Sequence, residues 1–281
     1  SKLEHKSILD LMNDLNKKGY MIDYVNLLPN GQIDLVDLEN KIRKDTILIS
    51  ICGVNSEVGY IQPLKKIKQI INKKNPRIIF HSDLTQALGK TKIDLSDVDL
   101  ATFSSHKIYG PQGCGILYKK RTLSISKLIY GTTANCPFRG GTPALPLIVA
   151  FSKAIELANK NLDKNVEKCK FLNKMLINGL AKYPIKINSN ELCVPQIVNI
   201  SLLNINNDDF VKELSDHKIY VSTTSACCTS DKGSIVLNEI NNNNKKISQT
   251  SIRISISHLT TEEEIATFLE LFNILWNKLN R

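Results

Sequence analysis

The sequence predicts an α/β protein with a large first domain built on a mainly parallel sheet and a smaller C-terminal α+β domain. Through the first half of the chain, short apolar runs alternate with amphipathic stretches, as strands alternate with crossover helices. After Pro146 a long stretch of helical periodicity replaces that alternation. The length of 281 residues lies where a single core tends to split. We therefore expect one domain over residues 1–150 and a second, opened by a long linking helix, over 151–281.

The elements of the first half follow from apolar patterning. The unbroken apolar run over residues 46–54 is typical of a strand buried on both faces. Apolar residues at helical spacing indicate a helix over 3–18, while Asp34 and Pro63 mark the starts of two more. The expected strands span residues 21–28, 46–54, 77–81, 100–104 and 115–118. The expected helices span residues 3–18, 35–42 and 63–75.

The second half should be richer in helix. Residues 147–180 keep helical periodicity with few breakers, which predicts one or two long helices. Thr260, Thr261 and the three following glutamates supply a cap and first-turn acids for the last helix. The asparagine-rich run at 241–246 predicts a polar loop. The other expected elements are strands at 197–202, 219–222 and 251–257 and helices at 208–217 and 261–279.

Composition excludes several classes of protein. The hydrophobic share of 42% and the charged share of 23% are ordinary globular values, which rules out a disordered or fibrous chain. No apolar run reaches the roughly 18–20 residues of a membrane span, so no membrane association is expected. The net charge of +10 is dispersed, without a block of five or six like charges. We therefore expect a solvated basic surface and no direct nucleic-acid ligand.

The seven cysteines are an odd number at irregular spacings, and no Cys-x-x-Cys occurs. This pattern argues against a zinc ribbon, a thioredoxin-type site and a disulfide framework. A reducing compartment, either the cytoplasm or an organelle such as the mitochondrion, is the expected location. Cys227 and Cys228 stand apart because small polar residues surround them, as in a loop. Most of the other cysteines should be small core residues.

Polar side chains follow three of the expected strands, at the edge where open α/β sheets bind ligands. The group is Asn55, Asp83, Gln86, Ser104, His106 and Lys107. Such a set suits pyridoxal phosphate, whose aldehyde condenses with a lysine amine and whose ring nitrogen stays protonated beside a carboxylate. Lys107 and Asp83 fit those two roles. The serine and histidine beside the lysine would bind phosphate, and either amide would bind the ring hydroxyl.

The order of these motifs resembles that of the cysteine desulfurases of the NifS and IscS type, which are class V, fold-type I enzymes dependent on pyridoxal phosphate. The matching pieces keep the family's order and approximate spacing over essentially the whole chain. They are EHK at 4–6, VNSEVG at 54–59, HSDLTQ at 81–86, SSHKIYGP at 104–111, RGGT at 139–142, SAC at 225–227 and SIR at 251–253. The resemblance implies the fold of the type I transferases that use this cofactor.

The resemblance also implies roles around the cofactor ring. Lys107 would be the Schiff-base lysine, and Asp83 would pair with the pyridine nitrogen. His5 would stack on the ring and move protons. Asn55 and Gln86 would contact the ring oxygen, and Asn55 would also touch the substrate carboxylate.

Further implied roles concern the phosphate, the substrate and the sulfur. Ser104, His106 and Thr142 would bind the phosphate, with Thr142 reaching in from the second subunit of a homodimer. Arg253 would hold the substrate carboxylate, for which its planar fork is well matched. Cys227 would attack the sulfur of the cysteine adduct, keep it as a persulfide and let alanine leave.

The implied function is that of a cysteine desulfurase, which would pass sulfur to an iron–sulfur scaffold or another acceptor protein for cluster assembly or tRNA thiolation. Two alternatives stay open: a selenocysteine lyase or other class V activity, and a catalytically silent homologue that acts as a binding scaffold. The family's usual N-terminal segment, with a phosphate-gripping turn, has no counterpart in this sequence, so we expect a fragment or a processed chain.

Overall fold

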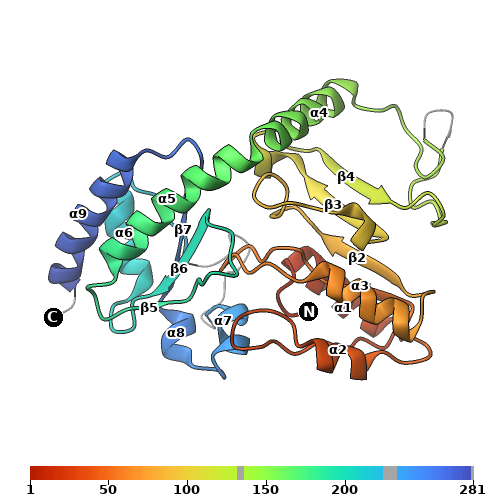
Figure 1. Cartoon of the computed structure of the whole chain (residues 1–281), viewed down its shortest axis with the longest axis horizontal. Coiled ribbons are helices and arrows are strands. Elements are labelled where there is room, and N and C mark those ends of the chain that lie inside the picture. The colour runs from red at the N-terminus through yellow and green to blue at the C-terminus, as the bar shows by residue number, and fades with distance from the viewer. Residues whose placement is uncertain (132–135, 224–232, 280–281) are drawn as a thin grey trace.

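The computed structural model describes residues 1–131, 136–223 and 233–279. In these residues a four-stranded sheet lies in the order β1 (Leu48–Ser50), β2 (Ile79–Asp83), β3 (Leu100–Ser104) and β4 (Gly115–Lys119). The first three strands are parallel, and β4 pairs antiparallel with β3 (Figure 1). Their carboxyl ends therefore share one edge, as the predicted α/β fold requires.

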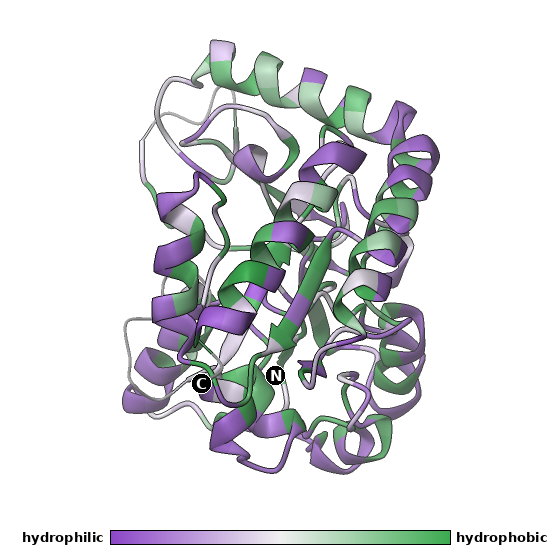
Figure 2. Ribbon diagram, turned by 90° about the vertical axis from the view of Figure 1, so that its left-hand side faces the viewer, coloured by the Kyte–Doolittle hydropathy of each residue, from purple (hydrophilic) through white to green (hydrophobic). Residues whose placement is uncertain are grey.

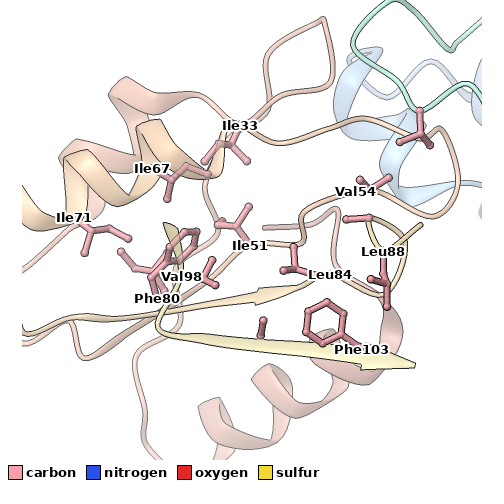
Figure 3. Packing of buried hydrophobic residues seen from close by; sticks show 14 of the residues in the cluster. Ile33, Ile51, Val54, Ile67, Ile71, Phe80, Leu84, Leu88, Val98 and Phe103 are labelled. Atoms are coloured by element: carbon pink, nitrogen blue, oxygen red, sulfur yellow. The ribbon is translucent and has the colours of Figure 1, made fainter. Parts of the chain in front are cut away.

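The first core lies between this sheet and its helices. These are α2 (Leu35–Lys41), α3 (Leu64–Lys74) and α4 (Leu145–Lys160), whereas α1 (Lys6–Lys17) contributes no buried residue to this core. Asp34 begins α2, where its side chain accepts hydrogen bonds from the next N–H groups. Ile67 and Ile71 of α3 pack beside Phe80 of β2 (Figure 3), and Phe151 brings α4 into the same cluster.

A second core lies under a three-stranded antiparallel sheet in the order β5 (Lys186–Ile187), β6 (Ile197–Ser201) and β7 (Ser251–Ser255). Phe210, Phe272 and Trp276 are buried there. The helices that cover this sheet are α5 (Leu162–Leu180), α6 (Asn207–Asp216) and α9 (Glu262–Leu279). Figure 1 shows α4 and α5 following one another from the first sheet to the second.

The remaining helices of the described residues are short. The single-turn helices η1 (Leu95–Asp97) and η2 (Ser105–Ile108) flank β3. Two more helices, α7 (Ile235–Ile240) and α8 (Lys245–Gln249), form a small third cluster with Leu3, Val58 and Tyr60. Hydrophilic and hydrophobic residues alternate along the outer helices (Figure 2), as expected when one face packs on a core. Within the described residues, no helix is long and apolar enough to cross a membrane.

The structure confirms the fold class and corrects several element predictions. Residues 21–28 form only an isolated bridge, Leu27 with Ile33, because their backbone hydrogen bonds are limited to a short turn in which Asn26 and Leu28 pair with residues 32–34. Of the strand predicted at 46–54, only Leu48–Ser50 forms β1, although backbone hydrogen bonds to the β2 segment continue from Ile47 to Gly53. The strand predicted at 219–222 is reduced to a bridge between Ser222 and Arg253. The polar loop predicted at 241–246 is wrong in its last residues, because α8 begins at Lys245.

Candidate active site

The carboxyl ends of β1, β2 and β3 bring the predicted site segments together. Past the end of β1, the Gly53 N–H donates to the Asp83 carbonyl across 2.9 Å. On the other side of β2, the Leu84 N–H donates to the Thr102 carbonyl across 3.0 Å. These bonds align the loops that carry Asn55 and Asp83 with the turn that follows Ser104, so one edge of the sheet holds all three segments.

Asn55 joins the start of the chain to this edge. Its side chain is buried, and Nδ2 donates to the Leu3 carbonyl across 3.1 Å. Its Oδ1 accepts the N–H groups of Glu57 and Val58 at 3.0 and 2.8 Å. His5, two residues after Leu3, is exposed and begins α1, with its Nδ1 accepting the Ser7 N–H. Asn55 therefore retains one free N–H for a ligand.

Asp83 and Gln86 occupy the turn after β2. One oxygen of Asp83 accepts the Thr85 N–H across 2.9 Å. The Lys90 ammonium donates to Gln86 Oε1 across 2.9 Å, which leaves the amide nitrogen of Gln86 as its free group. Burial, with a smaller contribution from the nearby Lys107 charge, lowers the pKa of Lys90 to about 8. The structure thus brings Lys107 near the segment that carries Asp83 and Gln86.

Lys107 lies on η2 with His106, and both side chains are exposed. No carboxylate pairs with the Lys107 ammonium among the ion pairs of the described residues. Tyr109 ends the turn in the left-handed region at a φ of 66°, and the Gly110 N–H then donates to the Ser105 carbonyl. This sharp turn ends η2 before the chain returns to the sheet as β4, and the amine of Lys107 has no ion-pair partner among the described residues.

Arg253 reaches this region from the second sheet. It lies on β7, and its Nη1 donates to the Ser56 carbonyl across 3.1 Å. Its Nε is buried and has no hydrogen-bond partner in the described part of the chain. Burial lowers the pKa of Arg253, while the charge of Glu57 opposes that effect. An unpaired guanidinium N–H in this position is a donor for a ligand carboxylate.

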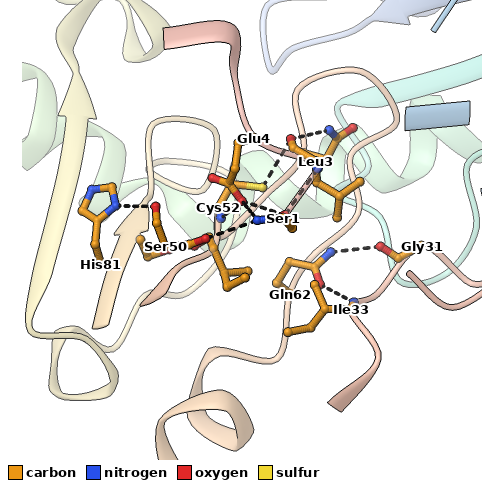
Figure 4. Close-up of polar contacts among 12 residues, drawn as sticks. Ser1, Leu3, Glu4, Gly31, Ile33, Ser50, Cys52, Gln62 and His81 are labelled. Atoms are coloured by element: carbon orange, nitrogen blue, oxygen red, sulfur yellow. Dashed lines mark hydrogen bonds and ion pairs between the residues drawn. The ribbon is translucent and has the colours of Figure 1, made fainter. Parts of the chain in front are cut away.

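Two polar residues of the site lie inside matched motifs, but the sequence assigned no role to either. His81 bridges the strands, with Nδ1 2.8 Å from Ser50 Oγ (Figure 4) and Nε2 3.3 Å from Thr102 Oγ1. Desolvation lowers the pKa of His81. Glu57 is buried, and its carboxylate accepts a hydrogen bond from Ser234 across 2.5 Å. Their position inside a matched motif was the only sequence signal that could have identified them as site residues. Contacts between segments far apart in the chain leave no trace in local sequence patterns.

One predicted residue, Thr142, is not brought to this edge by any contact of the described residues, and a second predicted residue lies outside them. Thr142 is exposed and follows Gly141, whose φ is 100°. Cys227 and its neighbour Cys228 lie outside the described residues. Among the described cysteines, Cys52 and Cys169 are buried, as expected of core residues, while Cys114, Cys136 and Cys193 are half-buried.

A cavity of about 420 Å³ opens behind η2. Lys90, Lys107 and Tyr109 line one side of it, and Gln196 and His258 line the other. The Tyr109 and His258 rings meet edge to face with centroids 5.2 Å apart. Neither Asp83 nor Arg253 lines this cavity, so it adjoins the predicted site without containing it. The described residues form no cluster of His, Cys, Asp and Glu suited to a metal ion.

Comparisons with known proteins agree with this geometry. The family profile described as aminotransferase class-V matches residues 1–268. Cysteine desulfurase IscS of Buchnera aphidicola subsp. Baizongia pistaciae is 37% identical over 283 residues, covering 98% of this chain and 69% of that protein. The mitochondrial cysteine desulfurase of Saccharomyces cerevisiae is 35% identical over 272 residues, covering 94% of this chain and 54% of that protein.

Solved structures show the same likeness. A NifS-like protein superimposes with a TM-score of 0.92 at 34% identity, covering 99% of this chain and 74% of that one. The NifS-like protein from Rickettsia africae ESF-5 gives a TM-score of 0.85 at 30% identity, covering 98% of this chain and 74% of that one.

Proposed function

Because this chain belongs to the class V aminotransferase family and, within it, to the cysteine desulfurases, we propose that it converts L-cysteine to L-alanine and retains the sulfur as a persulfide on Cys227. The observation that carries this proposal is Arg253, which reaches from the second sheet to the edge bearing Asn55, Asp83 and Lys107. Its buried, unpaired Nε–H suits the carboxylate of an amino acid.

The donor set fits pyridoxal phosphate. Lys107 offers an amine that no carboxylate of the described residues neutralises, and Asp83 has an oxygen beyond the one that accepts the Thr85 N–H. The free N–H groups of Asn55 and Gln86 are donors for the ring oxygen. When bound, the cofactor supplies an electron sink for the breaking of bonds at the substrate Cα.

The chain's own residues then have distinct tasks. Lys107 binds the cofactor aldehyde and afterwards holds or returns a proton at its amine. Asp83 keeps the ring nitrogen protonated. His5, exposed at the start of α1, stacks on the ring and moves a proton at the substrate. Ser104 and His106 donate hydrogen bonds to the phosphate.

Substrate and sulfur engage the remaining residues. Arg253 binds the L-cysteine carboxylate, and the one free N–H of Asn55 is shared between that carboxylate and the ring oxygen. The Cys227 thiolate attacks the substrate sulfur, so that an S–S bond forms as the C–S bond breaks. The persulfide then passes to an iron–sulfur scaffold or another sulfur-acceptor protein, for cluster assembly or tRNA thiolation.

A homodimer completes the phosphate site in this proposal. Thr142 lies on the chain between two exposed apolar groups, residues 128–130 and the α4 residues Ile148 and Val149. Such a surface suits an interface with a second copy, through which Thr142 enters the other subunit's site. A large domain over 1–150 and a small one over 151–281 complete the proposed organisation. The second core cluster lies wholly within 151–281, and the first lies mainly within 1–150 but also takes in Phe151, Val194 and Ile197.

The experiment uses the purified protein supplied with pyridoxal phosphate. We expect a yellow chromophore that borohydride bleaches, and sulfide release from L-cysteine with a thiol reductant. Lys107→Ala should lose both. Cys227→Ala should keep the colour and lose the sulfide, whereas the matched control Cys228→Ala should keep both. Failure to bind the cofactor overturns the proposal, and loss of sulfide only in Cys228→Ala reassigns the nucleophile.

A further inference from the structure

Glu57 is a buried carboxylate to which the proposed chemistry assigns no task. It is 8% exposed and lies in the loop after β1, two residues beyond Asn55. Its backbone is held on both sides: the N–H donates to Asn55 Oδ1, and the carbonyl accepts from Asn199 Nδ2 across 3.2 Å. Its side chain leaves this loop and reaches α7.

The partner of the Glu57 side chain is the cap of α7. Ser234 Oγ accepts the Leu237 N–H, which caps the helix, and donates its own hydrogen to Glu57 Oε2 across 2.5 Å. The Ser234 N–H also donates to the Ser248 carbonyl. A side chain on Gly233, where φ is 70°, would lie 2.8 Å from the Ser248 backbone. These contacts fix the position of Ser234, and so the position of the hydroxyl that binds Glu57.

The same loop orients Arg253. The Ser56 carbonyl, one residue before Glu57, accepts from Arg253 Nη1, while Nε remains unpaired in the described part of the chain. Ser222 pairs with the Arg253 backbone through two hydrogen bonds of 3.1 and 2.6 Å. Two hydrogen-bonded residues therefore flank residues 224–232: Ser222, which pairs with the Arg253 backbone, and Ser234, which donates to the Glu57 carboxylate.

A purely structural role would explain a polar side chain at the cap of α7, but it gives no reason for the link to Arg253. No ion pair joins Glu57 to Arg253, so the carboxylate does not hold the guanidinium by direct contact. The link is indirect: Ser234 hydrogen-bonds the Glu57 side chain, and the Ser56 carbonyl that accepts from Arg253 belongs to the peptide bond preceding Glu57. Displacement of that carbonyl would let the guanidinium turn and use its free N–H elsewhere.

We propose that Glu57 is a positioning residue: its hydrogen bond to Ser234 holds the Ser56 carbonyl in place, which orients Arg253 for the carboxylate of the amino-acid substrate. This inference rests on the proposed function for the assignment of Arg253. The hydrogen bond orients the group, whereas the negative charge of Glu57 weakens the attraction of Arg253 for a second carboxylate. Glutamine, a neutral side chain of the same shape, should therefore also keep Arg253 oriented.

The test compares Glu57→Ala, Glu57→Gln and Ser234→Ala in the protein loaded with cofactor. For Glu57→Ala we expect the KM for L-cysteine to rise about tenfold with kcat within about twofold, the pattern of lost substrate binding. Glu57→Gln should keep KM at or below the wild-type value, because it keeps the hydrogen bond and removes the competing charge. Ser234→Ala should raise KM, and the double variant with Glu57→Ala should add little.

A second readout does not depend on turnover. The wild type and each variant are titrated with L-alanine, the proposed product, and binding is followed by the change in visible absorbance. Its dissociation constant should follow the same order as KM. The matched control is Gln62→Ala, which removes a buried side chain that joins Gly31 and Ile33 (Figure 4) on the far side of the same loop. It should lower stability and leave both constants unchanged.

The possible outcomes separate the two proposals. An unchanged KM and alanine affinity in a folded Glu57→Ala protein overturn the positioning role while sulfide release stands. A KM raised equally in Glu57→Gln overturns the hydrogen-bond argument. Absence of sulfide release from the wild type overturns the proposed function and, with it, the assignment of Arg253.

Discussion

Gly110 shows how one residue can control the turn that carries Lys107. A Cβ added there would collide with Ser105 Oγ and lie 3.1 Å from the Ser105 carbonyl, which accepts the Gly110 N–H. Ser105 is fully buried, and its hydroxyl has no hydrogen-bond partner in the described residues. The close approach of these two residues allows η2 to end abruptly beside the sheet.

Gly110→Ala should therefore disturb the turn and lower cofactor affinity at least several-fold, with a loss of stability of about 1–3 kcal/mol typical of overpacking. Titration of the purified variant with pyridoxal phosphate measures the first effect, and chemical unfolding measures the second. Ser105→Ala combined with Gly110→Ala removes the colliding oxygen and should restore most of both. No recovery in the double variant would show that the collision is not the cause.

Asp99 joins three elements of the first core through one carboxylate. It accepts from Lys68 of α3 across 2.5 Å, from the Phe80 N–H of β2 across 2.9 Å and from Lys120 across 3.0 Å. Burial alone would raise its pKa. The hydrogen bonds from Lys68, Phe80 and Lys120 outweigh burial and lower the pKa of Asp99 below the ordinary carboxyl value.

A carboxylate with a lowered pKa in the folded protein stabilises the fold above its ordinary pKa of about 3.9 and loses that contribution as the pH falls through the folded-state value. Asp99→Asn should therefore cost about 1 kcal/mol near pH 7, and the difference from wild type should shrink below about pH 4. Urea unfolding at several pH values measures it. A difference that stays constant down to pH 2 would contradict this account.

At the scale of the element, α9 begins with a reciprocal cap. The Glu264 N–H donates to Thr261 Oγ1 across 3.2 Å, and the Thr261 N–H donates to Glu264 Oε2 across 2.9 Å. This pattern satisfies two N–H groups that the helix itself leaves free. The helix then buries Phe268, Phe272 and Trp276 in the second core, so its start determines where those rings lie.

Thr261→Ala should lower the free energy of unfolding by about 1 kcal/mol, because it removes the cap hydroxyl. Thr261→Ser keeps the hydroxyl and serves as the control, with little loss. In a double-mutant cycle, Glu264→Ala should cost less in the Thr261→Ala background than in the wild type. Additive losses would mean that the two halves of the cap act independently.

Elements with strong local signals could be predicted from the sequence. Continuous apolar runs located β2 and β3, and capping residues located α2 and α9 within a residue or two. Elements that depend on a distant partner could not. Residues 21–28 have strand-like composition but lack neighbouring strands, whereas α8 forms in a polar run. There, Ser248 binds the α7 cap and the Ile247 carbonyl accepts from Ser201.

The candidate site shows the same limit. Asn55, Asp83 and Lys107 each follow a strand, so the rule that ligands bind at strand carboxyl ends was enough to group them. Arg253 came from motif resemblance alone, because its contact with Ser56 joins residues 197 positions apart in the sequence. The contact between Glu57 and Ser234 could not be predicted, because their hydrogen bond spans 177 residues.

At the scale of the whole molecule, the loop around Tyr60 joins the two sheets. Tyr60 is 2% exposed, and its hydroxyl donates to the Asn188 carbonyl across 2.8 Å. On either side of it, the Ile61 N–H donates to the Leu192 carbonyl, and the Gly59 carbonyl accepts the Val194 N–H. Burial raises the pKa of Tyr60, so its hydroxyl remains a donor throughout the physiological range.

Tyr60→Phe should lower the free energy of unfolding by about 1–2 kcal/mol, because it leaves a buried carbonyl without its donor. In the Tyr60→Phe variant, backbone amides of both β6 and β2 should exchange faster with solvent, since the loop couples the two sheets. The control is Tyr183→Phe. The exposed hydroxyl of Tyr183 donates to Asn273 of α9, and its removal should lower the free energy of unfolding less. Equal losses in the two variants would argue against a special role for the connection.

The order of the first sheet has a consequence for how the chain behaves during folding. In the described residues β1 and β4 are its edge strands, and their surroundings are apolar: Ile47 is 65% exposed and Leu117 is 53% exposed. The start of the chain covers part of the β1 edge, where the Ser1 amine donates to the Ser50 carbonyl. An edge strand such as β4 is a template for pairing with another chain, so it favours aggregation when the protein is concentrated. The basic residues Lys119, Lys120 and Arg121 at the end of β4 act as gatekeepers there, since like charges oppose stacking of identical edges.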